Sequence, residues 1–360
     1  MCSLVLGVRF LEYLVYPGDQ TSGTGPLTRT LALLETVVGQ EKDRKIVVDD
    51  WITEYNELHK SDDPSQRNSA YAKMVNAYYE LATSFYEWGW GASFHFSYRM
   101  QGESFAEGIR RHEYSLASHL MLKPGTKVVD VGCGIGGPMR NITRFTGWDV
   151  TGITVNEYQV RRGNQMVTEE GLDGQCRLAQ MDFMDLKFPP GSMDALLSSP
   201  LLSSPLLWGQ ASQQTGEKSR TLTATHPVGF EGNFDQTSVR NIRWIKKAIE
   251  EGDALPDMAF TWEVAKAMKA AGFEMVHERD MALDPNQEIQ WHVPMTPSWN
   301  PLCQRFQFNF FGLFCTTWIL RLLEFVYVVP SGTSKIQVVL QTAGMGCAAG
   351  GETGSFTPMY

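Results

Sequence analysis

Residues 127–138, KVVDVGCGIGGP, join a short run of β-branched side chains to a turn that is rich in glycine. The apolar run predicts a buried strand over residues 127–131. Pro138 suits the first turn of a helix, so the stretch predicts a strand, a glycine turn and a helix in that order. Such a turn lets the backbone come close to a nucleotide-sized ligand at the end of the strand.

The alternation of strand and helix continues on both sides of this turn. Helices are predicted over 103–122, around 139–145 and over 157–170, and strands over 149–154, 176–181 and from 193 onward. This order predicts a doubly wound, Rossmann-like α/β fold with a parallel sheet. The remaining predictions are helices over 51–86, 240–251 and 262–271, a strand over 273–279, and a mostly helical chain after residue 299.

The residue before the glycine turn indicates which nucleotide binds there. Gly132, Gly134 and Gly137 satisfy the pattern G-x-G-x-x-G, which is typical of dinucleotide sites. However, Asp130 would repel a pyrophosphate and attract the amine and sulfonium of S-adenosylmethionine (SAM). The residues predicted to hold SAM are Asp130, Gly132, Gly134, Gly136, Gly137, Thr154, Gln159 and Asp182, with Glu157 as an acidic alternative.

Residues 86–97, YEWGWGASFHFS, place five aromatic rings, one histidine and two glycines in a short span. Two glycines so close together disfavour a regular helix, and a polar loop would not carry so many rings. One interpretation is an irregular cavity wall whose π faces stabilise a cation, with His95 as a proton acceptor. The other is a hydrophobic plug in which His95 is an ordinary buried histidine.

Several segments together resemble sterol 24-C-methyltransferase. They are residues 74–81, 86–97, 102–104, 111–113, 129–138, 273–275, 289–291 and 356–359. The resemblance implies a class I methyltransferase fold with N-terminal helices. It also implies that residues 1–50 form an extension and linker, 51–290 the methyltransferase core, and 291–360 a sterol-specific, mostly helical region.

The resemblance further implies a reaction in which the sterol side-chain alkene attacks the methyl group of SAM. A carbocation forms, a hydride shifts and a base removes a proton. The rings of Tyr86, Trp88, Trp90, Phe94 and Phe96 would shield the cation, and Tyr86 is counted with the catalytic group. His95 or Glu103 would take the proton, whereas Glu87 and His112 could instead hold neighbouring elements. Asp253 matches a family acid that meets the polar end of the sterol or the cation, although it could equally be a turn residue that caps the helix near Trp262.

Residues 196–229 depart from the family pattern. LSSPLLSSPLL, residues 197–207, repeats a pentapeptide, and its prolines cannot sit inside a central strand. We therefore expect two central strands to be lost, and the chain also stops at Tyr360, where the family continues through a last strand. These departures leave two alternatives open: a non-catalytic or defective member that binds SAM or sterol, and a methyltransferase acting on another lipid.

Composition limits the partners and the compartment. The chain has 31 Lys and Arg against 40 Asp and Glu, which gives a net charge of -9 and disfavours nucleic acid as a partner. Six cysteines stand singly, so no metal site and a reducing compartment are expected. The aromatic segment 306–330 would cover a sterol cavity, lie on a membrane or join a homo-oligomer. A sterol substrate implies peripheral membrane contact, and we expect an intracellular protein at the endoplasmic reticulum or on lipid droplets.

Overall fold

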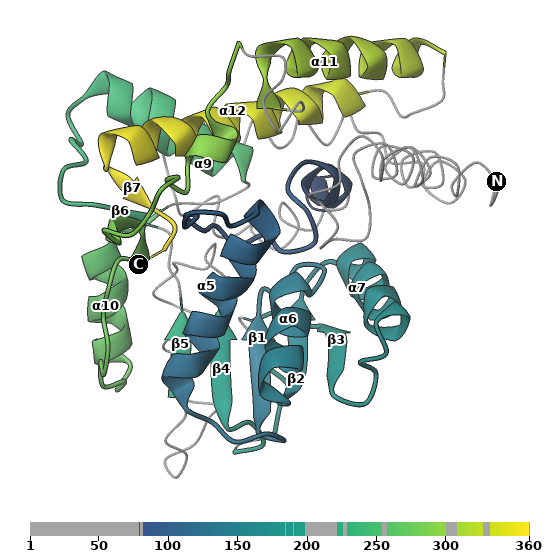
Figure 1. The fold of residues 1–360 in the computed structure, drawn as a ribbon, viewed down its shortest axis with the longest axis vertical. Coiled ribbons are helices and arrows are strands. Elements are labelled where there is room, and N and C mark those ends of the chain that lie inside the picture. Colours follow the sequence, from purple (N-terminus) through teal and green to yellow (C-terminus); the bar gives the residue numbers. More distant parts are fainter. Residues whose placement is uncertain are drawn as a thin grey trace.

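The computed structural model describes residues 79, 82–183, 185–189, 191–198, 222–225, 229–253, 258–299, 308–326 and 332–359. A parallel sheet with flanking helices forms one part of the molecule, and the helices α11 (Phe310–Phe325) and α12 (Thr333–Thr353) lie beyond the ends of its strands (Figure 1). None of the helices in these described ranges is long and apolar enough to cross a bilayer.

Five parallel strands form the sheet in the order β3-β2-β1-β4-β5. Their bounds are β1 (Lys127–Val131), β2 (Asp149–Thr154), β3 (Cys176–Gln180), β4 (Ala195–Ser198) and β5 (Leu222–Thr225). The predicted bounds of β1 and β2 are confirmed, and β3 ends one residue earlier than predicted. The sheet confirms the predicted Rossmann-like fold, because the chain leaves β1 toward β2 on one side and later returns to the other side as β4.

Local capping signals explain where the flanking helices begin. α5 (Phe105–Leu120) starts at Ser104, whose hydroxyl accepts a hydrogen bond from the Glu107 N–H in a capping box. α6 (Gly137–Thr146) carries a proline in its first turn. In α7 (Glu157–Glu169) the Asn156 side chain accepts a hydrogen bond from the Gln159 N–H. All three helices match the sequence predictions to within a few residues.

The prediction that two central strands are lost was wrong. β4 pairs with β1 over residues 195–198 and ends before the first proline of the repeat. The proline, which lacks an N–H, therefore does not interrupt the hydrogen bonds between the two strands. β5, with the sequence LTAT, pairs with β4 from within the Ser/Thr-rich run. Alternating threonines suit a strand. Residues 199–221 lie outside the described ranges.

Three further predictions need correction or completion. The strand predicted over 273–279 belongs to no sheet in the described part of the chain, where these residues lack regular structure. The predicted helix over 240–251 is divided into a π-helical turn η2 (Asn241–Lys246) and α9 (Lys247–Gly252), and the next helix is α10 (Thr261–Ala270). The helix predicted over 51–86 lies mostly outside the described residues, which show its last part as helical over 82–89.

The C-terminal region packs onto the methyltransferase core through a mixed aromatic cluster. β6 (Gly229–Phe230) pairs antiparallel with β7 (Phe356–Thr357), which ties the end of the chain to the segment after the sheet. Short turns η3 (Met281–Leu283) and η4 (Val293–Met295) lead toward α11. The cluster includes Trp90, Tyr98, Phe230, Trp291 and Phe356, all buried. The 86–97 segment and the C-terminal region therefore share one hydrophobic core.

Candidate functional site

The glycine turn after β1 lies at the point where the strand order reverses. Gly132, Gly134 and Gly136 adopt positive φ angles of 74°, 55° and 74°, a conformation that favours glycine. The N–H groups of Gly132 and Cys133 donate to the Ile153 carbonyl at the end of β2, at 2.9 and 3.1 Å. In doubly wound sheets, ligands bind beyond the carboxyl ends of the strands at this reversal. The turn is therefore in the position of a nucleotide site.

Asp130 occupies the end of β1 beneath this turn. Its side chain is buried, and burial raises the pKa of the carboxyl to about 7. A desolvated carboxyl of this kind gains most from a cationic ligand, because an adjacent positive charge restores its ionised form. The amine and sulfonium of SAM are such charges, so this residue fits the predicted cofactor.

The other predicted cofactor residues follow β2 and β3. The Thr154 hydroxyl donates to Gln159 Oε1 at 2.7 Å, and Gln159 Nε2 donates to the Thr83 hydroxyl at 3.0 Å. Asp182 and the buried ring of Phe183 follow β3 directly. The structure therefore brings all eight predicted cofactor residues to one edge of the sheet. That they contact SAM stays a prediction.

The aromatic segment lies directly against the glycine turn. A Cβ atom placed on Gly137 would be 2.0 Å from the Ala92 carbonyl oxygen, so the two backbones are in van der Waals contact. A Cβ atom on Gly134 would be 3.1 Å from Cδ2 of Phe94. The preceding helical residues 82–89 are fastened to α7 by the ion pair of Glu87 with Arg162, with N–O distances of 2.5 and 3.1 Å. Glu87 thus anchors one element to another.

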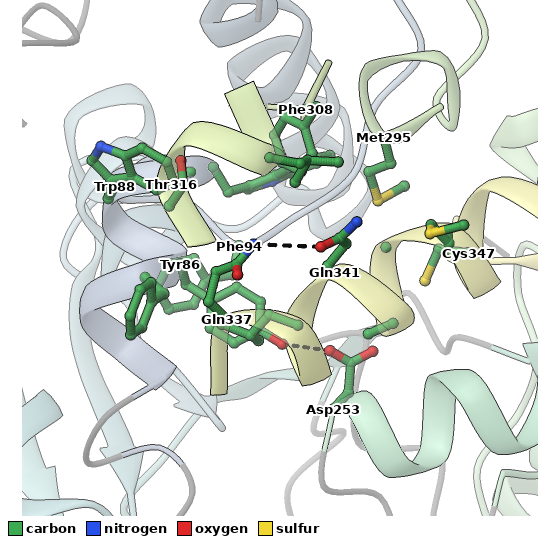
Figure 2. Close-up of a pocket in the computed structure, with 18 of the residues that line it drawn as sticks. Tyr86, Trp88, Phe94, Asp253, Met295, Phe308, Thr316, Gln337, Gln341 and Cys347 are labelled. Carbon is green, nitrogen blue, oxygen red and sulfur yellow. Dashed lines mark hydrogen bonds between the residues drawn. The ribbon is translucent and has the colours of Figure 1, made fainter. Parts of the chain in front are cut away.

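A large apolar cavity opens on the other side of the aromatic segment (Figure 2). Its empty space, counted out into the open mouth, is about 1150 Å³. Every substrate residue predicted from the sequence lines it, namely Trp88, Trp90, Phe94, Phe96 and Asp253, together with Tyr86. α11 and α12 supply much of the facing wall, including Leu313, Thr316, Gln337, Leu340, Gln341 and Cys347.

Asp253 and Tyr86 form a polar pair within this apolar lining. The Tyr86 hydroxyl donates a short hydrogen bond to Oδ1 of Asp253, and the Tyr79 hydroxyl donates to the Asp253 backbone carbonyl at 3.3 Å. Burial raises the pKa of Asp253 to about 6, and the hydrogen bond from Tyr86 opposes that shift. Asp253 ends α9 and has no part in capping α10, whose N-cap is Phe260.

His95 lies behind the cavity wall, although its neighbours Phe94 and Phe96 line it. Its Nδ1 is 3.6 Å from Oε1 of Glu113, and its ring packs edge-on against the buried His112 ring. Burial lowers the pKa of His95 to about 4 and raises the pKa of Glu113 to about 7. His95 as the proton acceptor stays a prediction, and its surroundings fit the interpretation of a buried histidine equally well.

Glu103, the other predicted proton acceptor, also has structural partners. Its Oε1 accepts from Arg111 Nε at 2.8 Å, and its Oε2 accepts from the Met100 N–H at 2.8 Å. Arg111 in turn donates to the Tyr98 carbonyl. These bonds fix the turn that precedes α5, and Glu103 is absent from the cavity lining among the described residues. Its catalytic role stays a prediction.

Sequence reasoning missed two groups of residues. Glu113 is buried beside His95, and its only sequence signal was its place in the quoted segment 111–113. The cavity residues of α12, such as Gln337 and Gln341, belong to a helix of weak amphipathic pattern. No motif marks them, since their role arises only when α12 is packed against distant segments.

With this geometry in place, comparison with known proteins decides the family. The chain is 38% identical over 309 residues to cycloartenol-C-24-methyltransferase of Arabidopsis thaliana, a match that covers 85% of this chain and 90% of the relative. The chain belongs to the sterol C-24-methyltransferase family. It is also 35% identical over 320 residues to sterol 24-C-methyltransferase of Schizosaccharomyces pombe, covering 85% of this chain and 82% of that protein.

Family and structural matches agree with this membership in the sterol C-24-methyltransferase family. Residues 303–360 match the family described as sterol methyltransferase C-terminal, and residues 66–202 match mycolic acid cyclopropane synthetase. The fold resembles the crystal structure of the mycolic acid cyclopropane synthase CmaA1, with a TM-score of 0.60 at 14% identity, covering 79% of this chain and 95% of that one. That likeness supports the class I methyltransferase fold.

Proposed function

We propose that this protein transfers a methyl group from SAM to the side-chain double bond of a sterol, at C-24. The observation that carries the proposal is the shared wall between the two sites. Phe94 contacts the glycine turn on one side and lines the aromatic cavity on the other. An alkene in the cavity would therefore lie next to the methyl donor, as transfer between them requires.

SAM, when bound, supplies an electrophilic methyl group. The chain's own residues position it: Asp130 would pair with the amine, the backbone of the glycine turn would lie along the ligand, and Thr154 with Gln159 would hold its polar groups. The contact of Gly137 with Ala92 keeps the turn pressed against the cavity wall. The cofactor would thereby be oriented toward the cavity.

The cavity would exclude water and stabilise the cation formed when the methyl group is transferred. Aromatic faces attract a nearby cation by about 0.5 to 2 kcal/mol each without forming a bond to it. Phe94 packs against Gly134 of the glycine turn, and the Tyr86 ring centroid is 5.3 Å from that of Phe94. Trp90 and Phe96, 5.2 Å apart, continue the wall.

Radiolabelled SAM incubated with sterols that carry a side-chain alkene tests the proposal. We expect label in the sterol fraction with the wild-type chain, and none with Asp130→Asn, which should also weaken SAM binding in calorimetry. Asp235→Asn is the matched control, because that carboxylate is exposed and does not line the cavity. Binding of SAM without label in any sterol would contradict catalysis and favour a non-catalytic family member. Label in another lipid alone would favour the second alternative.

We further propose that the outer face of α11 rests on a membrane at the endoplasmic reticulum or on a lipid droplet, from which the sterol enters. This face carries large apolar side chains that are each 55–80% exposed: Phe311, Phe314, Trp318, Ile319, Leu322 and Phe325. The inner face of the same helix lines the cavity through Leu313 and Thr316. Arg321 is exposed, whereas Glu324 accepts hydrogen bonds from Ser334. Aromatic and apolar residues beside a cationic group suit an anionic lipid interface.

Flotation with vesicles that contain anionic lipid tests the membrane proposal. Trp318→Glu with Leu322→Glu should abolish binding, and Val276→Glu, at a residue 85% exposed elsewhere, should leave it intact. If the double variant instead changes a wild-type oligomer into a monomer without affecting flotation, this face joins subunits. Fluorescence microscopy of a tagged chain tests the compartment.

A further inference from the structure

We propose that the Tyr86–Asp253 pair is the proton acceptor that completes the reaction. This inference rests on the proposed function and concerns the last step, in which the cation becomes an alkene. The pair was expected to contact the sterol or the cation, and His95 or Glu103 to take the proton. The geometry of the cavity points to a different division of roles.

Tyr86 and Asp253 both face the cavity. Asp253 is the only carboxylate among the described residues that line it, and the described lining contains no histidine. His95 lies behind the wall beside Glu113, and Glu103 is bonded to Arg111. A proton acceptor has to reach the substrate directly or through one intervening group. Asp253, through Tyr86, meets that condition.

The pair also lies near the cofactor turn, with one ring between them. The Tyr86 ring is 5.3 Å from the Phe94 ring, and Phe94 lies against Gly134 of the cofactor turn. The helical residues that carry Tyr86 are bonded to α7 at Gln159 through Thr83. The pair therefore stands at the cofactor end of the cavity, where the cation forms.

Asp253 is held firmly in place by its own helix and by two tyrosines. It ends α9, and α9 is pressed against α12 so closely that a Cβ atom on Gly252 would be 2.2 Å from Cβ of Ala343. Tyr79 and Tyr86 both donate hydrogen bonds to Asp253, one to its backbone and one to its carboxylate. A proton acceptor held in this way stays in position throughout turnover.

The last step breaks one C–H bond and moves two protons. The C–H bond next to the cationic carbon breaks, and its electron pair becomes the new C=C bond. The proton passes to the Tyr86 oxygen while the Tyr86 O–H proton passes to Oδ1 of Asp253, so the carboxylate ends neutral and later releases its proton to solvent. The phenol also stands between the cation and the carboxylate, which hinders formation of an ester between them.

Substitutions at the pair test this assignment in the full chain with SAM and a side-chain alkene sterol. Asp253→Asn should lower single-turnover formation of the methylated alkene by about 10²- to 10⁴-fold, the range of general-base catalysis, with SAM affinity changed less than about threefold. Tyr86→Phe keeps the ring and should likewise reduce alkene formation. Asp253→Glu should restore part of the rate. In the two defective variants, methylated sterol should accumulate as a water-captured alcohol or a shifted alkene.

Turnover in the acid range gives a second readout. The described titratable groups that face Asp253 are Tyr79 and Tyr86, whose hydroxyls donate hydrogen bonds to it, and Cys347, whose thiol pKa is raised by burial. Wild-type turnover should therefore fall below about pH 6 as Asp253 is protonated. Asp253→Asn should lose this acid limb while His95→Gln keeps it.

Two results would overturn the assignment. One is Asp253→Asn with a rate within threefold of wild type and unchanged products, and the other is loss of the acid limb in His95→Gln alone. If the wild-type chain methylates no sterol, the proposed function fails first. The pair is then tested by binding of a sterol with a side-chain ammonium group, which mimics the cation. Asp253→Asn should weaken that binding at least tenfold, and equal affinity would refute the pairing.

Discussion

Replacing Gly137 by alanine tests whether the glycine turn and the aromatic segment form one unit. The added Cβ would meet Ala92 O at 2.0 Å, Ala92 C at 2.4 Å and Ser93 Cα at 2.7 Å, all of them backbone atoms. Backbone cannot turn aside as a flexible side chain can, so either the turn or the 92–93 segment has to move. Overpacking in a well-packed site costs about 1–3 kcal/mol, and we expect Gly137→Ala to reach about 3 kcal/mol.

Urea unfolding followed by circular dichroism measures this loss, and calorimetry measures SAM affinity in the folded variant. Gly174→Ala is the control, because a Cβ there meets nothing within 4 Å and its φ is not positive. We expect the control to stay within about 0.5 kcal/mol of wild type. Equal stability and equal SAM affinity in the two variants would refute the close contact between the cofactor turn and the cavity wall.

Three further predictions concern single side chains. Phe94→Ala should lower the rate of sterol methylation more than tenfold, because the ring separates the two sites. Phe145→Ala, which removes a half-exposed ring in α6, should leave the rate unchanged. Equal rates in the two variants would contradict this role of Phe94. Asp130→Asn should become more stable relative to wild type as the pH rises from 5 to 8. Burial raises the pKa of Asp130 in the folded protein to about 7, so the native state binds this proton more tightly than the unfolded state does. The wild-type protein therefore loses stability as the pH rises and the carboxyl ionises, whereas the Asn variant does not. Melting temperatures of the two proteins that differ by the same amount at every pH would refute this. Ser104→Ala should cost about 1 kcal/mol of unfolding free energy by removing the N-cap of α5, as measured by urea titration, and an unchanged midpoint would argue against the cap.

Much of the sheet was predictable because its signals are local. The apolar runs of β1 and β2 are bounded by clear turn residues, and the helices between them begin at a proline or a capping side chain. β5 was missed because its four residues are not bounded by clear turn residues and form a strand through their pairing with β4. For the segment 273–279 a strand was predicted where none forms. Its composition suits a strand, but a strand also needs a neighbouring strand with which to pair.

The candidate site also contains some residues that local sequence signals predict and others that only tertiary packing brings together. The residues at the strand ends and in the aromatic segment were predicted together, since each follows a recognisable stretch. The position of His95 behind the cavity wall could not be predicted from the sequence. In an irregular segment, neighbouring residues can point their side chains in opposite directions, one into the cavity and the next into the core. The partnership of Tyr86 with Asp253 joins residues 167 positions apart and depends on how α9 packs against α12.

The contact between the glycine turn and the 92–94 segment has a thermodynamic consequence. A displacement of the turn on cofactor binding would be transmitted to Phe94, and so to the cavity that this ring lines. If occupancy of one site shifts that ring, the two ligands bind cooperatively, and linkage requires each to change the affinity of the other by the same factor. The dissociation constant of an inhibitor that fills the cavity would then differ according to whether SAM or its demethylated product occupies the neighbouring site.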